Sequence, residues 1–241
     1  MSFERRSYGE DIHITEKDNP VEKKLAYTTE AKDFIKSHPG IIRAILNGIG
    51  TEEMNYFRGG YELVEPGLKK EINGVLIETF DTERNNWVYK ITVDEKSFFL
   101  KLSEDFDISD GYAPTYDGGA AEVLSSAKAE EIFSGEDDVK VIKAHFGFSK
   151  GPKNNQIKYY ASDWNESALI NAQQYRALLI KDLEQGKISQ EVLENFEKRS
   201  SAILEKLDSH GFHDTGLFNM AYDPEQQQFI LFDLALQNET N

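Results

Sequence analysis

The stretch from His210 to Ala235 has the sequence HGFHDTGLFNMAYDPEQQQFILFDLA. Within it, Asp214 stands five residues before Asn219, and Asp233 directly follows an apolar Phe-Ile-Leu-Phe run. Between them, the residues Tyr222-Asp223-Pro224-Glu225 are typical of a turn, because Asp and Pro favour turn conformations. The pattern predicts a loop, a short strand, a turn and a second short strand, which bring three oxygen-bearing side chains together.

Three side chains of this kind suit phosphoryl transfer. One carboxylate can orient an attacking hydroxyl group, while an Asn and a second Asp hold Mg²⁺ on the phosphates of a nucleotide. A structural role is the alternative, since Asp214 can cap a turn and Asp233 can cap a strand end. The spacing alone does not separate the two interpretations.

The composition limits the size of the fold and the classes of molecule that the chain can bind. The chain of 241 residues is long enough for one large domain or two small ones, and its hydrophobic content of 39% suffices for a core. The formal net charge of −16 predicts a soluble chain that binds neither nucleic acid nor anionic membrane. The charge suits a basic protein partner, and an acidic surface that only aids solubility is the alternative interpretation. Cysteine is absent, which excludes a disulfide framework and a Cys-type zinc site. We expect no membrane insertion, because no apolar run reaches membrane-spanning length.

The first 74 residues form a separate region in this interpretation. Residues 1–27 are polar and charged, so we expect a poorly ordered tail or a strap. Residues 28–50 carry an apolar face at helical spacing, interrupted at His38-Pro39-Gly40, which predicts helix. We interpret the region as a helical extension that braces the rest of the chain or binds a partner.

From Val75 onward the periodicity is that of strands and helices. Alternating or apolar runs bounded by turn residues predict strands at 75–80, 87–93, 98–102, 139–142 and 156–160. Helical periodicity predicts helices at 120–133, 167–185 and 189–207. The sequence therefore predicts an α+β fold with one helix inserted after the third strand.

This order of elements, together with the polar spacing and the terminal Asp of the stretch quoted above, resembles the protein-kinase superfamily over residues 75–235. The resemblance implies a minimal bilobal kinase-like fold. Its N-lobe would be a five-stranded antiparallel sheet over residues 75–163, and its C-lobe would be a truncated helical lobe over residues 164–241. Residues 1–74 would form the N-terminal tail and helical extension.

The resemblance also implies roles for individual residues. Asp214 matches the catalytic-loop Asp that orients the acceptor hydroxyl, and Asn219 and Asp233 match the two ligands of Mg²⁺ or Mn²⁺. Lys101, in the strand sequence FFLKL, matches the lysine that contacts the ATP phosphates. An exposed lysine on an edge strand is the alternative interpretation of this residue.

Two further features complete the implied ATP site. Glu122 matches the helix glutamate that pairs with the strand lysine, and Glu130 and Glu131 are alternatives on the same helix. The glycine-rich phosphate loop of kinases is missing, and Asn85 and Asn86 occupy the corresponding turn. Asn tolerates a left-handed backbone, so these residues can turn backbone amides toward phosphate. A similar turn occurs in aminoglycoside-phosphotransferase-type and choline-kinase-like enzymes.

The chain departs from the kinase pattern in two places. Phe212 stands where kinases have His, with His213 directly after it, and Leu234-Ala235 replaces the Phe-Gly that follows the metal-binding Asp. Residues 234–241 alone follow that Asp, which resembles the truncated effector kinases that bacterial secretion systems deliver (the OspG and NleH type). Such a kinase would be constitutive or activated by a host protein, and would act in the cytoplasm or inside a host cell.

The sequence supports one leading function and two alternatives. The leading hypothesis is an ATP-dependent kinase that transfers the γ-phosphate to a Ser or Thr hydroxyl of a protein. The alternatives are a small-molecule kinase of the aminoglycoside or sugar type, and a kinase-like binding module without turnover. ATP and Mg²⁺ or Mn²⁺ are the expected cofactors of either kinase.

Overall fold

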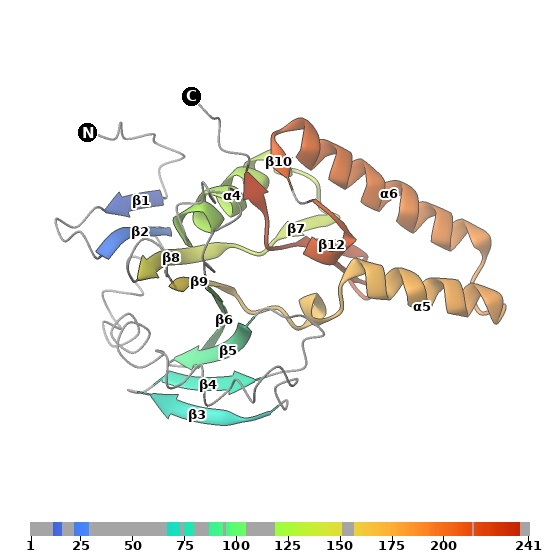
Figure 1. Ribbon diagram of the computed structural model, residues 1–241. Helices are drawn as coiled ribbons and strands as arrows, with labels where there is room; N and C mark the ends of the chain where they lie inside the picture. The colour runs from blue at the N-terminus through green and yellow to red at the C-terminus, as the bar shows by residue number, and fades with distance from the viewer. Residues whose placement is uncertain are drawn as a thin grey trace, which may run out of the picture. The chain divides into compact units, whose positions relative to one another are not determined.

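The computed structural model has an α+β fold (Figure 1). It combines a large antiparallel sheet with α-helices and short additional sheets. The residues that the structure describes are 12–15, 22–28, 67–72, 75–79, 87–93, 95–104, 119–150, 157–213 and 215–236.

The chain divides into two compact units. The first consists of Met1–Leu124 and Ala144–Trp164, and the second of Ser125–Lys143 and Asn165–Asn241. The division falls inside helix α4 (Gly119–Ile132), so this helix begins in the first unit and ends in the second.

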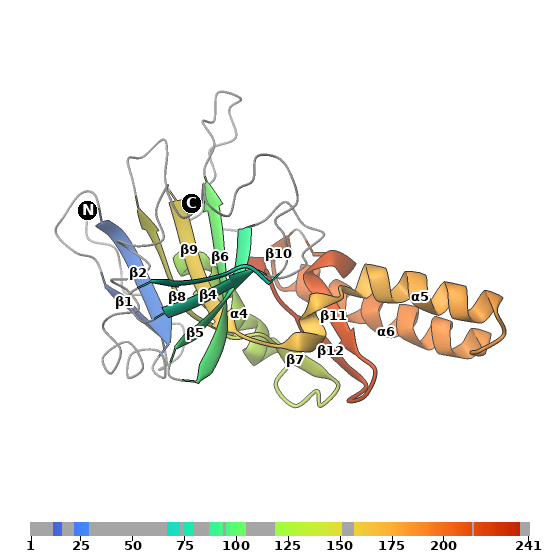
Figure 2. The ribbon, with the colours of Figure 1, turned by 90° about the horizontal axis from the view of Figure 1, so that it is seen from below.

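The first unit is built on a sheet of eight strands: β1 (Ile12–Thr15), β2 (Glu22–Thr28), β3 (Lys69–Ile72), β4 (Val75–Thr79), β5 (Trp87–Val93), β6 (Lys96–Glu104), β8 (Ala144–Lys150) and β9 (Ile157–Asp163). Their order across the sheet is β1-β2-β8-β9-β6-β5-β4-β3. Neighbouring strands all pair antiparallel. Figure 2 shows β8, β9 and β6 side by side.

The alternating sequence of the central strands produces one buried face. In β4, the side chains of Val75, Ile77 and Thr79 are buried, while the residues between them are partly exposed. Residues that pair directly across antiparallel strands share a face of the sheet. The register therefore forms one apolar row from Ile77, Ile91 and Phe98, and another from Tyr89, Leu100 and Ala161.

The strands predicted at 75–80, 87–93 and 98–102 and the helix predicted at 120–133 are confirmed as β4, β5, β6 and α4. The assignment of 139–142 to the same sheet was wrong. This run forms β7 (Val139–Val141), which pairs with a strand of the second unit, while β8 is the hairpin partner of β9. A short apolar run fits any sheet edge, so its sequence does not identify its partner.

The N-terminal region also differs from expectation. Residues 12–15 and 22–28, expected in a tail or strap, form β1 and β2, and β3 adds a strand at the opposite edge. The sheet therefore has eight strands where five were predicted. Added edge strands gain backbone hydrogen bonds from a neighbour, and these bonds do not require an apolar sequence pattern. The helix expected within residues 28–50 lies outside the described residues.

The second unit contains the end of α4, the helices α5 (Ala172–Glu184) and α6 (Gln190–Ser209), and the 3₁₀ turns η1 (Glu166–Leu169) and η2 (Leu217–Asn219). Its strands are β7, β10 (Phe212–His213), β11 (Met220–Asp223), β12 (Gln228–Leu231) and β13 (Ala235–Leu236). Strand β12 pairs antiparallel with β11 and parallel with β7, and β10 pairs antiparallel with β13.

Helix α6 confirms the helix predicted at 189–207. Helix α5 confirms the helix predicted at 167–185 from Ala172 onward only, because residues 166–169 form the separate turn η1. The two helices lie side by side in Figures 1 and 2. The N-terminus of α5 is closed by a capping box, in which Asn171 and Gln174 each accept a hydrogen bond from the backbone of the other. Among the described helices, none has the length and apolar character needed to cross a bilayer.

The core of the second unit is assembled mainly from α6, α5 and the β11–β12 hairpin. The buried residues of α6 recur at helical spacing and lie against those of the hairpin. The core consists of Ala129, Phe133, Val139, Ala172, Leu179, Leu193, Phe196, Ile203, Leu207, Phe212, Met220, Phe229, Leu231 and Leu234.

Replacement of Ile203 by Ala tests this core. Ile203 is fully buried, so we expect a loss of about 2–5 kcal/mol in the free energy of unfolding. Val192→Ala in the same helix is the matched control, because Val192 is 44% exposed and its truncation should change stability by less than about 0.5 kcal/mol. Urea unfolding followed by circular dichroism measures both, and equal losses would contradict the packing described here.

Candidate functional site

The β11–β12 hairpin brings Asn219 and Asp233 to the same end. The predicted turn between its strands is present, and Met220 pairs with Leu231 in the last register position. Asn219 directly precedes β11, and Phe232 and Asp233 directly follow β12. The backbone N–H of Phe232 donates to the carbonyl of Asn219 at 3.1 Å, which extends the pairing beyond the strands. Asn219 and Asp233, fourteen positions apart in sequence, thus lie at the same end of the hairpin.

Both residues have environments that fix them. Asn219 closes η2, is 6% exposed, and donates its backbone N–H to the carbonyl of Gly216 at 3.0 Å. Asp233 is partly buried and has a φ of 55°, in the left-handed region that few non-glycine residues adopt. Asp is one of the residues that tolerate this region, at a cost of about 1–3 kcal/mol when the structure imposes it. Strained and buried polar positions of this kind cluster at functional sites.

The β10–β13 pair joins the chain before Asp214 to the chain after Asp233. Here His213 pairs with Ala235 in the antiparallel register. The Nδ1 of His213 also lies 3.1 Å from the carbonyl oxygen of Ala235, and it must carry the proton because a carbonyl oxygen can only accept. Asp214 itself lies outside the described residues. Its preceding residue is nevertheless fastened to the segment that follows Asp233.

For four other predicted site residues, the structure describes either the backbone alone or nothing. Lys101 belongs to β6, where its backbone pairs with Val88 and Tyr160, but its side chain is not described. Glu122 belongs to α4, also without a described side chain. Asn85 and Asn86 lie outside the described residues. The structure therefore shows that Lys101 lies on β6 and that Glu122 lies on α4.

The alternatives to Glu122 on α4 have surface partners. Glu130 is exposed, and its carboxylate lies 3.9 Å from the Nζ of Lys143. Glu131 is exposed and accepts a hydrogen bond from Lys128 at 2.8 Å. Both glutamates thus take part in exposed ion pairs near the C-terminal end of the helix.

The far end of the hairpin is fixed by Asp223. Its buried carboxylate accepts hydrogen bonds from the hydroxyl of Ser167 at 2.7 Å and from the backbone N–H groups of Glu225 and Gln226 at 2.9 and 3.1 Å. The bond from Ser167 is the largest cause of the lowered pKa of Asp223, so this carboxylate is ionised at neutral pH. The turn and η1 are thereby tied together.

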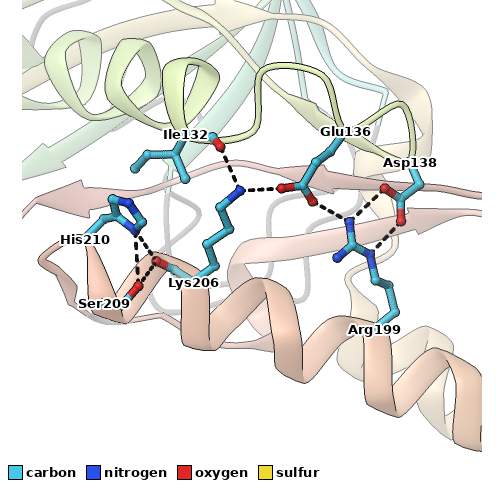
Figure 3. Close-up of polar contacts among 7 residues, drawn as sticks. All are labelled: Ile132, Glu136, Asp138, Arg199, Lys206, Ser209 and His210. Atoms are coloured by element: carbon cyan, nitrogen blue, oxygen red, sulfur yellow. Dashed lines mark hydrogen bonds and ion pairs between the residues drawn. The ribbon is translucent and has the colours of Figure 1, made fainter.

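An ion network that the sequence analysis missed holds α6 to the segment after α4 (Figure 3). Arg199 forms a bidentate pair with Asp138, with N–O distances of 2.6 and 2.8 Å, and also contacts Glu136 at 2.5 Å. Lys206 pairs with Glu136 and donates to the carbonyl oxygen of Ile132, the last residue of α4, at 2.9 Å. Arg199 and Lys206 are two helical turns apart and therefore lie on one face of α6. This spacing is the feature of the sequence that indicates a shared acidic partner.

The network keeps its members charged. The hydrogen bond from Lys206 is the main cause of the lowered pKa of Glu136, and that from Arg199 is the main cause of the lowered pKa of Asp138. The pairing with Asp138 in turn raises the pKa of Arg199. Since bidentate, charge-assisted bonds fix geometry as well as contribute energy, the network holds the end of α4 against α6.

Comparison of the sequence with protein-family models and with curated proteins gave no match. Among the described residues, no group of three or more His, Asp or Glu side chains is placed to hold a metal ion.

Replacement of Arg199 by Ala tests the ion network. We expect a loss of about 1–2 kcal/mol at pH 7, because the network is partly exposed and therefore weaker than a fully buried one. Arg176→Ala, which removes a more exposed pair with Glu197, is the control and should cost less than about 1 kcal/mol.

The loss in Arg199→Ala should also depend on pH. In the folded protein, the pKa values of Glu136 and Asp138 lie below their ordinary values of 4.5 and 3.8. The network's contribution is therefore complete above those ordinary values and disappears as pH falls through the lowered folded-state values. Urea unfolding from pH 7 down to pH 3 measures this, and a loss that stayed constant over that range would contradict the assignment.

Proposed function

We propose that the chain is an ATP-dependent phosphotransferase with a minimal kinase-like architecture. The observation that carries the proposal is that Asn219 and Asp233 both lie at one end of the β11–β12 hairpin. The His213–Ala235 pairing supports it further, because it ties the chain before Asp214 to the same place. These are the three residues to which the kinase resemblance gives the acceptor-orienting and metal-binding roles.

The order of elements in the first unit supports the same proposal. Three antiparallel strands, β4, β5 and β6, are followed by helix α4 and then by β8 and β9, which return to the same sheet. Lys101 on the third of these strands and Glu122 on the helix occupy the elements that carry the phosphate-binding lysine and its glutamate partner in kinases. The proposed lobes are residues 75–163 and 164–241. The chain passes from the first unit to the second after Trp164, whereas Ser125–Lys143, within the proposed N-lobe, also belongs to the second unit.

The donors at the hairpin end fit Mg²⁺ or Mn²⁺. A carboxylate and an amide oxygen are hard ligands, which these ions prefer, and both ions bind with few protein ligands when a nucleotide supplies phosphate oxygens. When bound, the ion would offset the negative charge of the phosphates. Such local compensation is necessary in this chain, because its net charge of −16 repels ATP.

The remaining roles belong to the chain's own side chains. Asp214 would orient the acceptor hydroxyl and accept its proton, and Lys101 would hold the phosphates. Burial restricts Asn219 to a narrow range of positions, so its amide oxygen would need little reorganisation. We propose a protein hydroxyl as the acceptor.

Nucleotide-dependent stabilisation tests the site. With Mg²⁺-ATP at 100 times its dissociation constant, the melting temperature of the wild type should rise by about 5–10 °C. Asp233→Asn should fold normally, because Asn also tolerates the left-handed backbone, but should lose the rise by removing a charged ligand. Asp182→Asn, at an exposed ion pair with Lys187, is the matched control and should retain it.

Transfer from γ-labelled ATP then separates the possible functions. We expect label in proteins of a cell lysate with the wild type and none with Asp214→Asn or Lys101→Ala. A melting shift without transfer to any protein or small-molecule hydroxyl would make the chain a binding module. The absence of any Mg²⁺-ATP shift in the wild type would overturn the proposed function.

A further inference from the structure

A buried hydroxyl group on α4 is bonded to the strand that follows Asp233. The side chain of Ser125 is 1% exposed, and its Oγ accepts a hydrogen bond from the backbone N–H of Leu236 at 3.1 Å. The two residues are 111 positions apart in sequence. The bond gives the N–H of Leu236 an acceptor and uses one acceptor site of the Ser125 hydroxyl group, and it fixes β13 to α4.

The same strand is fastened on its other side by His213. The carbonyl oxygen of Ala235, the residue before Leu236, accepts from the Nδ1 of His213 at 3.1 Å. Strand β13 consists of these two residues alone. Its backbone is therefore held both by α4, through Ser125, and by β10, through His213 and the strand pairing.

The position of Asp233 depends in part on the two-residue strand β13. On one side, Asp233 is preceded by β12, whose strand pairing is regular. On the other side, one buried residue, Leu234, separates it from β13. Its left-handed backbone is a conformation that persists where the flanking segments impose it. Release of β13 would remove one of the two strands that flank Asp233.

The bond involves the helix whose sequence also carries Glu122. Ser125 lies three residues after Glu122 on the same helix, which is almost one full turn. The two-residue strand thus joins the helix of Glu122, the segment after Asp233 and the residue before Asp214.

We propose that Ser125 and His213 are positioning residues of the nucleotide-metal site and act on Asp233 through β13. This inference rests on the proposed function. Groups that orient metal ligands typically change metal affinity by about 10–100-fold when they are removed. Ser125 and His213 would thus influence the binding of the ion without contacting it.

The dependence of ATP binding on Mg²⁺ concentration tests this inference. By isothermal titration calorimetry, Ser125→Ala and His213→Phe should each weaken the apparent Mg²⁺ affinity of the ATP complex by about 10-fold or more. ATP binding without metal should change by less than about 3-fold, because Lys101 is left in place. His213→Asn should restore most of the affinity, because the amide N–H of Asn can replace the N–H at Nδ1.

Ser200→Ala is the matched control. Ser200 is also buried in the second unit, but its hydroxyl donates to the carbonyl oxygen of Glu197 within its own helix. This variant should keep the wild-type Mg²⁺ affinity even if its melting temperature falls. Amide hydrogen exchange at Leu236 gives a readout without ligand, and should be faster in Ser125→Ala and unchanged in Ser200→Ala.

The outcomes separate the inference from the proposed function. A wild type that binds no Mg²⁺-ATP would sink the proposed function and this inference with it. A wild type that binds Mg²⁺-ATP, with Ser125→Ala and His213→Phe folded and equal to it in Mg²⁺ affinity, would sink the inference alone. If Ser125→Ala does not fold, the comparison of His213→Phe with His213→Asn decides the question for the same strand.

Discussion

The register of the β11–β12 hairpin is the constraint on which the candidate site depends. Asn219 and Asp233 lie at the same end of the hairpin because Met220 pairs with Leu231 and because the N–H of Phe232 continues the ladder to the carbonyl of Asn219. A slip of one residue would reverse the faces of the strand and move Asp233 away from Asn219. Three features hold the register: Asp223 closes the turn, β7 pairs with β12, and the apolar side chains of both strands enter the core.

The rest of the second unit holds that hairpin in place. Helix α6 supplies a continuous apolar face, while Arg199 and Lys206 on its flank secure the end of α4. The stability that such a frame provides offsets two local costs at the hairpin end. One is the burial of the polar Asn219, and the other is the left-handed backbone of Asp233. Such energetic costs are typical of positions where the residue type is selected for function and not for stability.

Local patterns in the sequence predicted most of the helices and strands from Val75 onward. They did not predict which strands pair with one another. The periodicity of α4, α5 and α6 and the Asp-Pro turn before β12 identify these elements directly. The partner of β7 and the placement of β1 and β2 were not predictable, because backbone pairing between distant segments leaves little trace in a single sequence. For the same reason, nothing in the sequence predicted the Ser125–Leu236 bond, because Ser125 is an ordinary serine in an Ala-rich helix. The hairpin that brings Asn219 near Asp233 was predicted because a turn and two apolar runs lie close together in the chain.

The most direct test of the central claim is to locate the metal ion with a paramagnetic probe. Mn²⁺-ATP broadens the amide signals of nearby residues in an NMR spectrum of the labelled protein. We expect the signals of Asn219 and Asp233 to broaden at the lowest Mn²⁺ concentrations, and we expect this selectivity to disappear in Asp233→Asn. Broadening that begins elsewhere, or that is equally strong in Asp233→Asn, would contradict the assignment of the hairpin end as the nucleotide-metal site.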